Sequence, residues 1–137
     1  AQLLDVASVG GSVTVPYGGR PIGFGLHVDV DTRLTGTPRA VLFHQLLPRH
    51  GNGLPKASVR VALLDCNVTC RTVSSGTAVL TRTHDGWVRQ VVTMSAVDTV
   101  MRSGDELRLA VVLLSRQNLS GLLVGFGAGT PSGLLLG

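Results

Sequence analysis

The sequence has little of what helical proteins use on their surfaces. It contains a single glutamate and a single lysine among 137 residues, and only 15% of its residues are charged. Helix surfaces are normally built from glutamate, lysine and alanine. Glycine, valine and threonine are frequent instead, and the latter two favour strands. The composition therefore predicts an all-β protein.

Long apolar runs are also missing. The longest candidate, Leu107 to Leu114, has eight residues and includes Arg108, whereas a membrane-spanning helix needs about 20. With 44% hydrophobic residues and a mean hydropathy of +0.35, the chain is too apolar for bulk disorder. We expect residues 1–137 to form one domain without a membrane span.

Clustered positive charge is absent, although the net charge is +4. The eleven arginines are spread singly from Arg20 to Arg116, and there are only five aromatic residues. A surface that follows nucleic-acid phosphates needs a stripe of cations, usually with aromatic platforms. No nucleic-acid partner is therefore expected.

Catalytic signatures are missing as well. The Gly-x-Ser-x-Gly turn of many serine hydrolases does not occur. The adjacent Asp105 and Glu106 suggest a solvated turn more than a glycosidase pair. The glycine-rich stretch 125–129 lacks the lysine of a phosphate-binding loop. We expect no enzyme, no catalytic residue and no cofactor.

Metal ligands do not form a recognisable set. The four histidines show no ligand spacing. Asp29 and Asp31 alternate along an expected strand and would share a face, as calcium ligands can. Calcium needs six to eight oxygens, however, so an exposed strand face is the simpler interpretation and no metal site is predicted.

The two cysteines, Cys66 and Cys70, lie four residues apart. This spacing favours a small disulfide loop, which is typical of proteins outside the cytosol, over free thiols or a metal site. The acceptor triplets for N-glycosylation begin at Asn67 and Asn118, where the alternative is that both asparagines form turns. The chain opens with Ala1, as a mature chain does after signal cleavage. These features predict an extracellular or cell-surface protein.

Short runs of strand-forming residues alternate with glycine, proline, asparagine and aspartate. The run 106–115 is nearly all apolar and is expected to be a central strand. Gly76 is expected to mark a hairpin or bulge. Val97 to Arg102 is expected to form the one helical turn. The pattern predicts a two-sheet antiparallel β-sandwich of the jelly-roll type. The nine or so expected strands cover residues 3–15, 22–32, 40–47, 57–64, 71–83, 87–94, 106–115, 122–126 and 134–136.

The second half of the chain carries a resemblance. Gly86-Trp87, the stretch 102–109 and the closing segments 125–127 and 131–136 resemble the jelly-roll, galactose-binding-like β-sandwich domains of secreted prokaryotic hydrolases and surface proteins. The resemblance, over residues 85–136, implies this fold and an exported setting. It carries no functional residue over, because such domains differ in role.

Two binding hypotheses follow from the remaining features. Trp87 and Tyr17 are the amphipathic aromatic residues, and either could serve as a sugar platform or as an anchor in the fold. The apolar start of the chain, with Leu3, Leu4, Val6 and Val9, could insert as a donated strand into a neighbouring copy. Gly10-Gly11 would then be the hinge.

The leading hypothesis is accordingly an extracellular structural subunit. Residues 1–9 would link copies of the chain into a homopolymeric fibre or surface layer, with glycans as covalent partners. The alternative is a carbohydrate-binding accessory module of a secreted protein, and an enzyme ranks third.

Overall fold

The computed structural model describes residues 2–5, 11–18, 21–49, 53–83, 86–126 and 132–136. Every regular element in these ranges is a strand, which confirms the predicted all-β fold. The strands are β1 (Gln2–Asp5), β2 (Gly11–Thr14), β3 (Ile22–His27), β4 (Thr32–Gly36), β5 (Arg39–Pro48), β6 (Lys56–Cys66), β7 (Cys70–Thr81), β8 (Val88–Thr93), β9 (Val97–Met101), β10 (Glu106–Gln117), β11 (Leu119–Phe126) and β12 (Gly133–Leu136).

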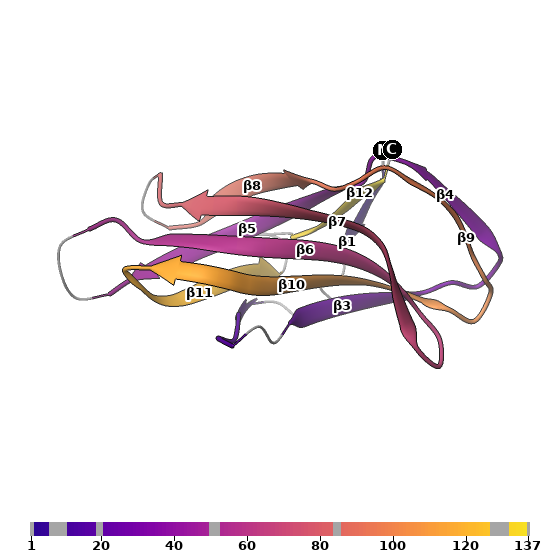
Figure 1. The fold of residues 1–137 in the computed structure, drawn as a ribbon, viewed down its shortest axis with the longest axis horizontal. Helices are drawn as coiled ribbons and strands as arrows, with labels where there is room; N and C mark the ends of the chain where they lie inside the picture. Colours follow the sequence, from indigo (N-terminus) through magenta and orange to yellow (C-terminus); the bar gives the residue numbers. More distant parts are fainter. Residues whose placement is uncertain are drawn as a thin grey trace.

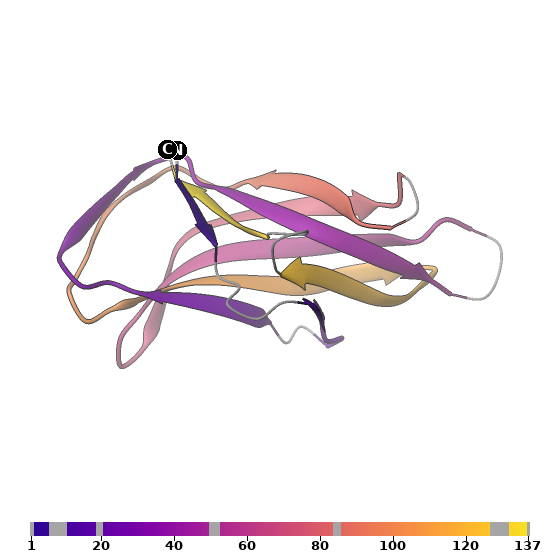
Figure 2. The same ribbon diagram turned by 180° about the vertical axis from the view of Figure 1, so that it is seen from behind.

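Two antiparallel sheets form the layers of the sandwich (Figures 1 and 2). In the first sheet, β5 pairs with β8 on one side and with β12 and then β11 on the other, and β1 and β2 lie beyond these. The second sheet has the order β3-β10-β6-β7. A small ribbon of β4 and β9 lies at one end. The predicted two-sheet antiparallel sandwich is confirmed.

Alternation of side chains explains how these strands build one core. On β6 and β10, every second residue is apolar and buried, and the residues between them face outward. The ribbon contributes Leu34, Val97 and Met101 to the same core, so it closes the end of the sandwich. The residues of the two central strands that belong to the core are Ala57, Val59, Val61, Leu63, Leu107, Leu109, Val111 and Leu113.

The start of the chain forms two separate strands instead of the single strand expected over residues 3–15. β1 pairs with β12 of the same chain, with Leu3 opposite Leu135 and Leu4 opposite Leu134. β2 pairs with β11 at a different place in the same sheet. Val6 and Val9 lie outside the described residues. Donation of this segment to another copy stays a prediction.

The predicted helical turn over Val97 to Arg102 is wrong. Val97–Met101 is strand β9, which pairs along its whole length with β4. The β-branched Val97, Thr99 and Val100 suit a strand, and tertiary pairing overrides the weak helix-capping pattern. The chain turns only afterwards, where the amide of Asp105 donates to the carbonyl of Arg102 at 3.0 Å.

Gly76 marks neither a hairpin nor a bulge. It lies inside the continuous strand β7, opposite Val61 on β6. A Cβ at this position would clash with the carbonyl oxygen of Thr93 and lie 3.3 Å from the Cα of Met94. The glycine therefore allows β7 to approach the end of β8 closely, which brings the two sheets together along this edge.

We predict that Gly76→Ala lowers the free energy of unfolding by about 1–3 kcal/mol, because rigid backbone atoms must move to admit the methyl group. Gly23→Ala on β3 is the matched control, since its Cβ would lie 3.5 Å from both the Arg108 side chain and the Leu109 carbonyl oxygen, which is an ordinary van der Waals distance. Urea denaturation of both variants measures the difference. Equal effects would show that the close approach does not constrain the fold.

Candidate functional site

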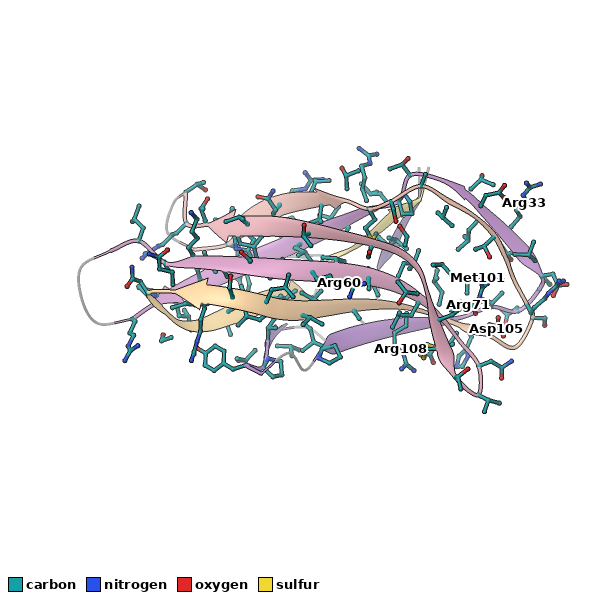
Figure 3. All side chains as sticks on the ribbon, viewed as in Figure 1. Arg33, Arg60, Arg71, Met101, Asp105 and Arg108 are labelled. Atoms are coloured by element: carbon teal, nitrogen blue, oxygen red, sulfur yellow. A yellow bond between two sulfur atoms is a disulfide. The ribbon has the colours of Figure 1, made fainter. Side chains whose placement is uncertain are left out.

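Polar side chains gather at the end of the sandwich that the β4–β9 ribbon closes. Arg33, Arg71 and Asp105 all lie in this region (Figure 3). Here the link after β3 meets the turn before β10, because the amide of Val28 donates to the carbonyl of Asp105 at 2.8 Å. The β6–β7 turn reaches the same place. Three connections far apart in sequence therefore form one end of the molecule.

Cys66 and Cys70 form a disulfide across the β6–β7 turn, as predicted, with an S–S distance of 2.08 Å. The two cysteines are direct cross-strand partners. Between them, the amide of Asn67 donates to the carbonyl of Thr69 at 2.9 Å. The side chain of Val68 at the tip is 96% exposed. The bridge thus fixes a short loop that projects into solvent.

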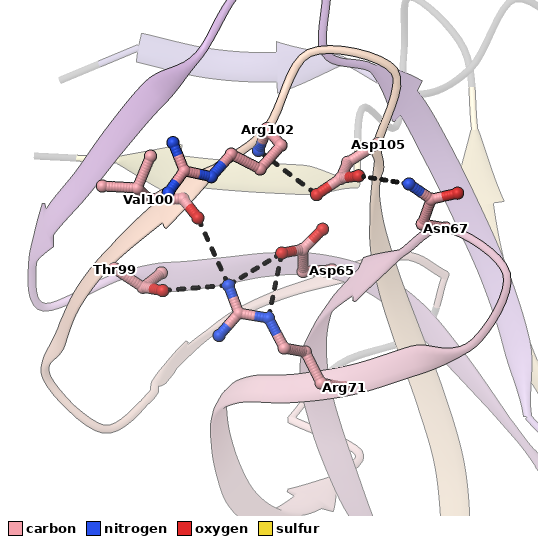
Figure 4. A network of polar contacts seen from close by, with 7 residues as sticks. All are labelled: Asp65, Asn67, Arg71, Thr99, Val100, Arg102 and Asp105. Carbon is pink, nitrogen blue, oxygen red and sulfur yellow. Dashed lines mark hydrogen bonds and ion pairs between the residues drawn. The ribbon is translucent and has the colours of Figure 1, made fainter.

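Arg71 joins β7 to β6 and β9 (Figure 4). Its Nε and Nη2 donate to Oδ2 of Asp65 at 3.0 and 2.8 Å. Nη2 also donates to the Thr99 hydroxyl at 3.0 Å and the Val100 carbonyl at 3.3 Å. Asp65 is buried, whereas Arg71 is half-exposed. The guanidinium therefore links a buried carboxylate to the closing ribbon.

Asp105 occupies the centre of this polar network. Its carboxylate accepts hydrogen bonds from the side-chain amide of Asn67 at 3.0 Å and from the backbone amide of Arg102 at 3.2 Å. Burial raises the pKa of Asp65, and the neighbouring Asp105 carboxyl raises it further, against the opposing effect of Arg71. The interaction with Asp65 lowers the pKa of Asp105. Asp65 therefore takes up a proton before Asp105 as the pH falls.

Two neighbouring carboxyls with shifted pKa values can act in acid–base catalysis, but the oxygens of this pair are engaged by the fold. Oδ2 of Asp65 is taken by Arg71, and both oxygens of Asp105 accept hydrogen bonds from the fold. Oδ1 of Asp65 is buried without a donor. The arrangement holds the ribbon and the disulfide loop on the sandwich. Sequence reasoning missed it, because Asp65 and Asp105 are 40 residues apart and no motif links them.

Both candidate glycosylation residues lie in turns between strands, as expected. Asn67 follows β6, and Asn118 sits between β10 and β11 with a φ of 52°. The side-chain nitrogen of Asn67, where a glycan would be attached, donates to Asp105. The carbonyl of Asn118 accepts from the amide of Arg49 at 2.9 Å. Both residues therefore have roles in turns, and their glycosylation stays a prediction.

The two candidate aromatic platforms do not come together. Trp87 precedes β8, and Tyr17 follows β2, and these strands lie at opposite edges of the sheet with β5 and β11 between them. Tyr17 donates its hydroxyl proton to the carbonyl of Ser120. The guanidinium carbon of Arg116 lies 3.7 Å from the Tyr17 ring centroid. A shared aromatic surface for a sugar ring is therefore not formed.

Asp29 and Asp31 do not share a strand face, because β3 ends at His27 and both lie in the link to β4. Asp31 accepts from the Ser103 amide at 2.9 Å and from Arg102 at 3.3 Å. The Ser103 hydrogen bond, aided by Arg102, lowers the pKa of Asp31. Across the described ranges, no group of three or more His, Cys, Asp or Glu side chains is arranged to hold a metal ion.

His44 is an unexpected member of the core. Alternation on β5 points it inward between Leu42 and Leu46, and it is fully buried. Neither ring nitrogen has a hydrogen-bond partner. Burial lowers the pKa of His44 from 6.5 to about 4, so the imidazole is neutral at pH 7. The sequence already indicated that His44 is buried, because it alternates with Leu42 and Leu46 on the apolar side of its strand.

The described part of the chain has no helix that is long and apolar enough to cross a membrane. Searches of family models and of curated proteins find no match to the sequence. Solved structures match its fold. A CocE/NonD family hydrolase from Staphylococcus aureus has a TM-score of 0.69 at 11% identity, over 95% of this chain and 33% of that one.

An aminopeptidase from a marine sediment archaeon, Thaumarchaeota archaeon, has a TM-score of 0.68 at 10% identity. It is matched over 85% of this chain and 25% of its own. The chain therefore spans a quarter to a third of these hydrolase structures. At such identities the likeness shows the fold alone. It confirms the expected resemblance to β-sandwich domains that occur in hydrolases, although neither match is described as galactose-binding-like.

We predict that Arg71→Leu lowers the free energy of unfolding by about 2 kcal/mol at pH 7, because it leaves the buried Asp65 without its cation. Loss of the cation raises the pKa of Asp65, so the deficit should shrink towards pH 4.5 as Asp65 takes up a proton. Arg33→Leu is the control. It removes an ion pair to Asp98 in which both side chains are 67% exposed, and we expect a change below about 0.5 kcal/mol.

Urea denaturation at both pH values measures these changes. A deficit that is independent of pH would contradict the electrostatic role of Arg71. So would an equal effect of Arg33→Leu.

We also predict that His44 makes the fold sensitive to acid. The unfolded chain takes up a proton at His44 below about pH 6.5 and the folded chain only near pH 4, so stability falls as pH falls through this window. The loss amounts to at most about 3 kcal/mol. His44→Leu should remove this component when the free energies of unfolding of the two proteins are compared from pH 7 to pH 4. Parallel pH profiles would contradict the prediction.

Proposed function

We propose that the chain is a non-catalytic β-sandwich module that works with a hydrolase outside the cytosol. The observation that carries this proposal is the length of the structural match. Nearly the whole chain aligns, yet it accounts for only a third of the Staphylococcus aureus hydrolase. A hydrolase of that size has room for its catalytic centre outside the matched third. This module would then bind a partner or position the catalytic part.

The chemistry of the described residues supports a non-catalytic role. The Asp65–Asp105 pair is the arrangement nearest to a catalytic dyad, and its oxygens are engaged by Arg71, Asn67 and the Arg102 amide. A general base needs a reachable proton to abstract. This pair instead lies buried under the ribbon, where it stabilises the fold.

The Cys66–Cys70 disulfide supports a location outside the cytosol. Disulfides persist in oxidising compartments and are rare where glutathione and thioredoxin keep thiols reduced. The bridge closes only a short loop, and its gain in the chain-entropy model is on the order of 2 kcal/mol. A disulfide of this kind is therefore what we expect in an exported module.

The accessory role is favoured over assembly by strand exchange. In the folded chain, β12 already has β1 as its partner, so the apolar N-terminal strand needs no second copy to complete its pairing. Sugar binding on paired aromatic platforms has less support, because Trp87 and Tyr17 lie at opposite edges of one sheet.

Native mass spectrometry of material from the source organism tests the proposal. We expect a particle heavier than 14.3 kDa that contains a hydrolase polypeptide, either continuous with this chain or bound to it. The chain alone should be a monomer that does not cleave chromogenic esters or aminoacyl anilides. A homopolymer that dissociates when residues 1–9 are deleted would favour strand exchange instead. Turnover by the isolated chain would overturn the non-catalytic assignment.

A further inference from the structure

Strand β3 lies at one edge of the second sheet. In the order β3-β10-β6-β7, it pairs with β10 alone among the described strands (Figure 1). The register of this pairing runs without interruption from His27 opposite Glu106 to Ile22 opposite Val111. The free side of an edge strand presents backbone groups that another chain can bind. In the described part of the chain, the second sheet therefore has an open side at β3.

Two backbone hydrogen bonds fix which groups of β3 face this open side. The amide of Val28 donates to the carbonyl of Asp105 at 2.8 Å, and the carbonyl of Val28 accepts from the amide of Gly104 at 2.9 Å. Both backbone groups of Val28 therefore point towards β10. In an antiparallel pair, this direction alternates from one residue to the next. The residues whose amide and carbonyl groups point to the open side are consequently Gly23, Gly25 and His27.

The opposite edge of the same sheet is already covered. The carbonyl of Ser75 on β7 accepts from the amide of Ser95 at 2.9 Å, and the Ser75 amide donates to the Ser95 hydroxyl at 3.2 Å. Open edges are otherwise protected by lysines, prolines or bulges. The six residues of β3 contain no lysine or proline, and their pairing with β10 contains no bulge. This edge therefore lacks the usual protection against an added strand.

The outer surface beside this edge is hollow, because two of the three outward-pointing residues are glycines. A depression of about 400 Å³ lies over Gly23 and Gly25, both of which are exposed. A Cβ at Gly25 would clash with the Glu106 side chain, and a Cβ at Gly23 would lie 3.5 Å from the Arg108 side chain. The glycines therefore allow these two side chains to extend across β3 towards its open side.

Glu106 and Arg108 are paired with each other beside this edge. Nε and Nη2 of Arg108 lie 2.7 and 2.6 Å from Oε1 of Glu106. The contact uses one edge of the planar guanidinium, and its faces can still stack on an aromatic ring. An added strand would place its side chains opposite Gly23 and Gly25 near this guanidinium. Aromatic side chains at these positions would cover the glycines and fill the depression.

A second copy of β3 would not fill this depression. If two copies paired antiparallel about Gly25, that glycine would face itself, and Gly23 would face His27. The centre of the depression would then lack a side chain on both copies. A strand of different sequence, with large residues at alternate positions, would satisfy both the backbone groups and the depression. The chemistry therefore favours a segment of another protein.

We propose that the open side of β3 is a docking site for an extended segment of a partner protein. The segment adds one antiparallel strand to the second sheet through the backbone groups of Gly23, Gly25 and His27. Its residues opposite the two glycines are aromatic, and one of them stacks on Arg108. The proposal rests on the accessory role, because it names the way in which a module of that kind holds its partner.

A blocked nine-residue peptide in which threonine and tryptophan alternate is the probe. Added to the isotopically labelled chain, it should slow hydrogen exchange at the amides of Gly23 and Gly25 by about tenfold or more, because both amides gain acceptors. The amides of Ile22 and Phe24 point to β10 and should keep their exchange rates. A peptide with alanine in place of tryptophan should bind about tenfold more weakly, because it leaves the depression unfilled.

Methylation of the peptide amides tests strand pairing without altering the protein. In the proposed pairing, the tryptophan amides point to β3 and the threonine amides point away from it. Methylation of the tryptophan amides should therefore abolish binding, because it removes the donors that the ladder needs. Methylation of the threonine amides should change affinity less than about threefold. Equal effects of the two modifications would overturn the proposal.

Matched variants test the same contacts from the side of the protein. Gly23→Pro removes an amide that faces the open side and leaves the ladder to β10 intact, so it should weaken binding about tenfold. Gly23→Ala keeps this amide and is the control, with an expected change below about threefold. Arg108→Gln should weaken binding of the tryptophan peptide about threefold and leave binding of the alanine peptide unchanged.

Three further outcomes would overturn the proposal. They are no binding of the tryptophan peptide, protection of the Gly23 and Gly25 amides before any peptide is added, and dimerisation of the chain through β3. Protection in the free chain would show that this edge is already paired. Failure of this proposal can be distinguished from failure of the accessory role, because native mass spectrometry detects a hydrolase partner whichever surface holds it.

Discussion

The structure depends on burying alternate aliphatic side chains of β5, β6 and β10 between two sheets. Each strand gives one row of residues to the core and leaves the other row free. A one-residue slip would exchange the two rows, so the core fixes the register of the central strands. It thereby also fixes which polar residues face outward. The ribbon of β4 and β9 closes the core at one end, and Arg71 and Asp105 hold it there.

Local patterns in the sequence predicted the features that depend on neighbouring residues. Alternation and turn residues identified most strands, and the cysteine spacing identified the disulfide. Features that depend on distant partners escaped prediction. Val97–Met101 is a strand only because β4 pairs with it, and Gly76 has a role only because Thr93 comes close. The Asp65–Asp105 pair and the contact of Tyr17 with Arg116 likewise join segments far apart in the chain.

The two ends of the molecule treat charge in different ways. At the ribbon end, carboxylates and guanidinium groups pair with one another and stabilise connections between loops. At the other end, Lys56 and Arg116 keep their charge uncompensated by the described residues, and an aromatic ring orders one of them. Charges that are paired inside a fold contribute to its stability. Ion pairs therefore connect loops at the ribbon end, and the stacked contact of Arg116 with Tyr17 connects the two sheets at the other end.

An irregularity at Leu114 interrupts β10 near its end. Pairing with β6 shifts between Leu113 and Ser115, so Leu114 is an extra residue in β10. Up to Leu113, odd-numbered residues of β10 face the core, whereas beyond the extra residue Ser115 and Gln117 face outward and Arg116 takes the inner side. A chain without Leu114 would continue the regular alternation from Leu113 and keep Ser115, Arg116 and Gln117 opposite the same residues of β6. The bulge therefore absorbs one additional residue locally, so insertion or deletion at Leu114 can occur in evolution without moving the core residues or the β10–β11 turn out of register with β6.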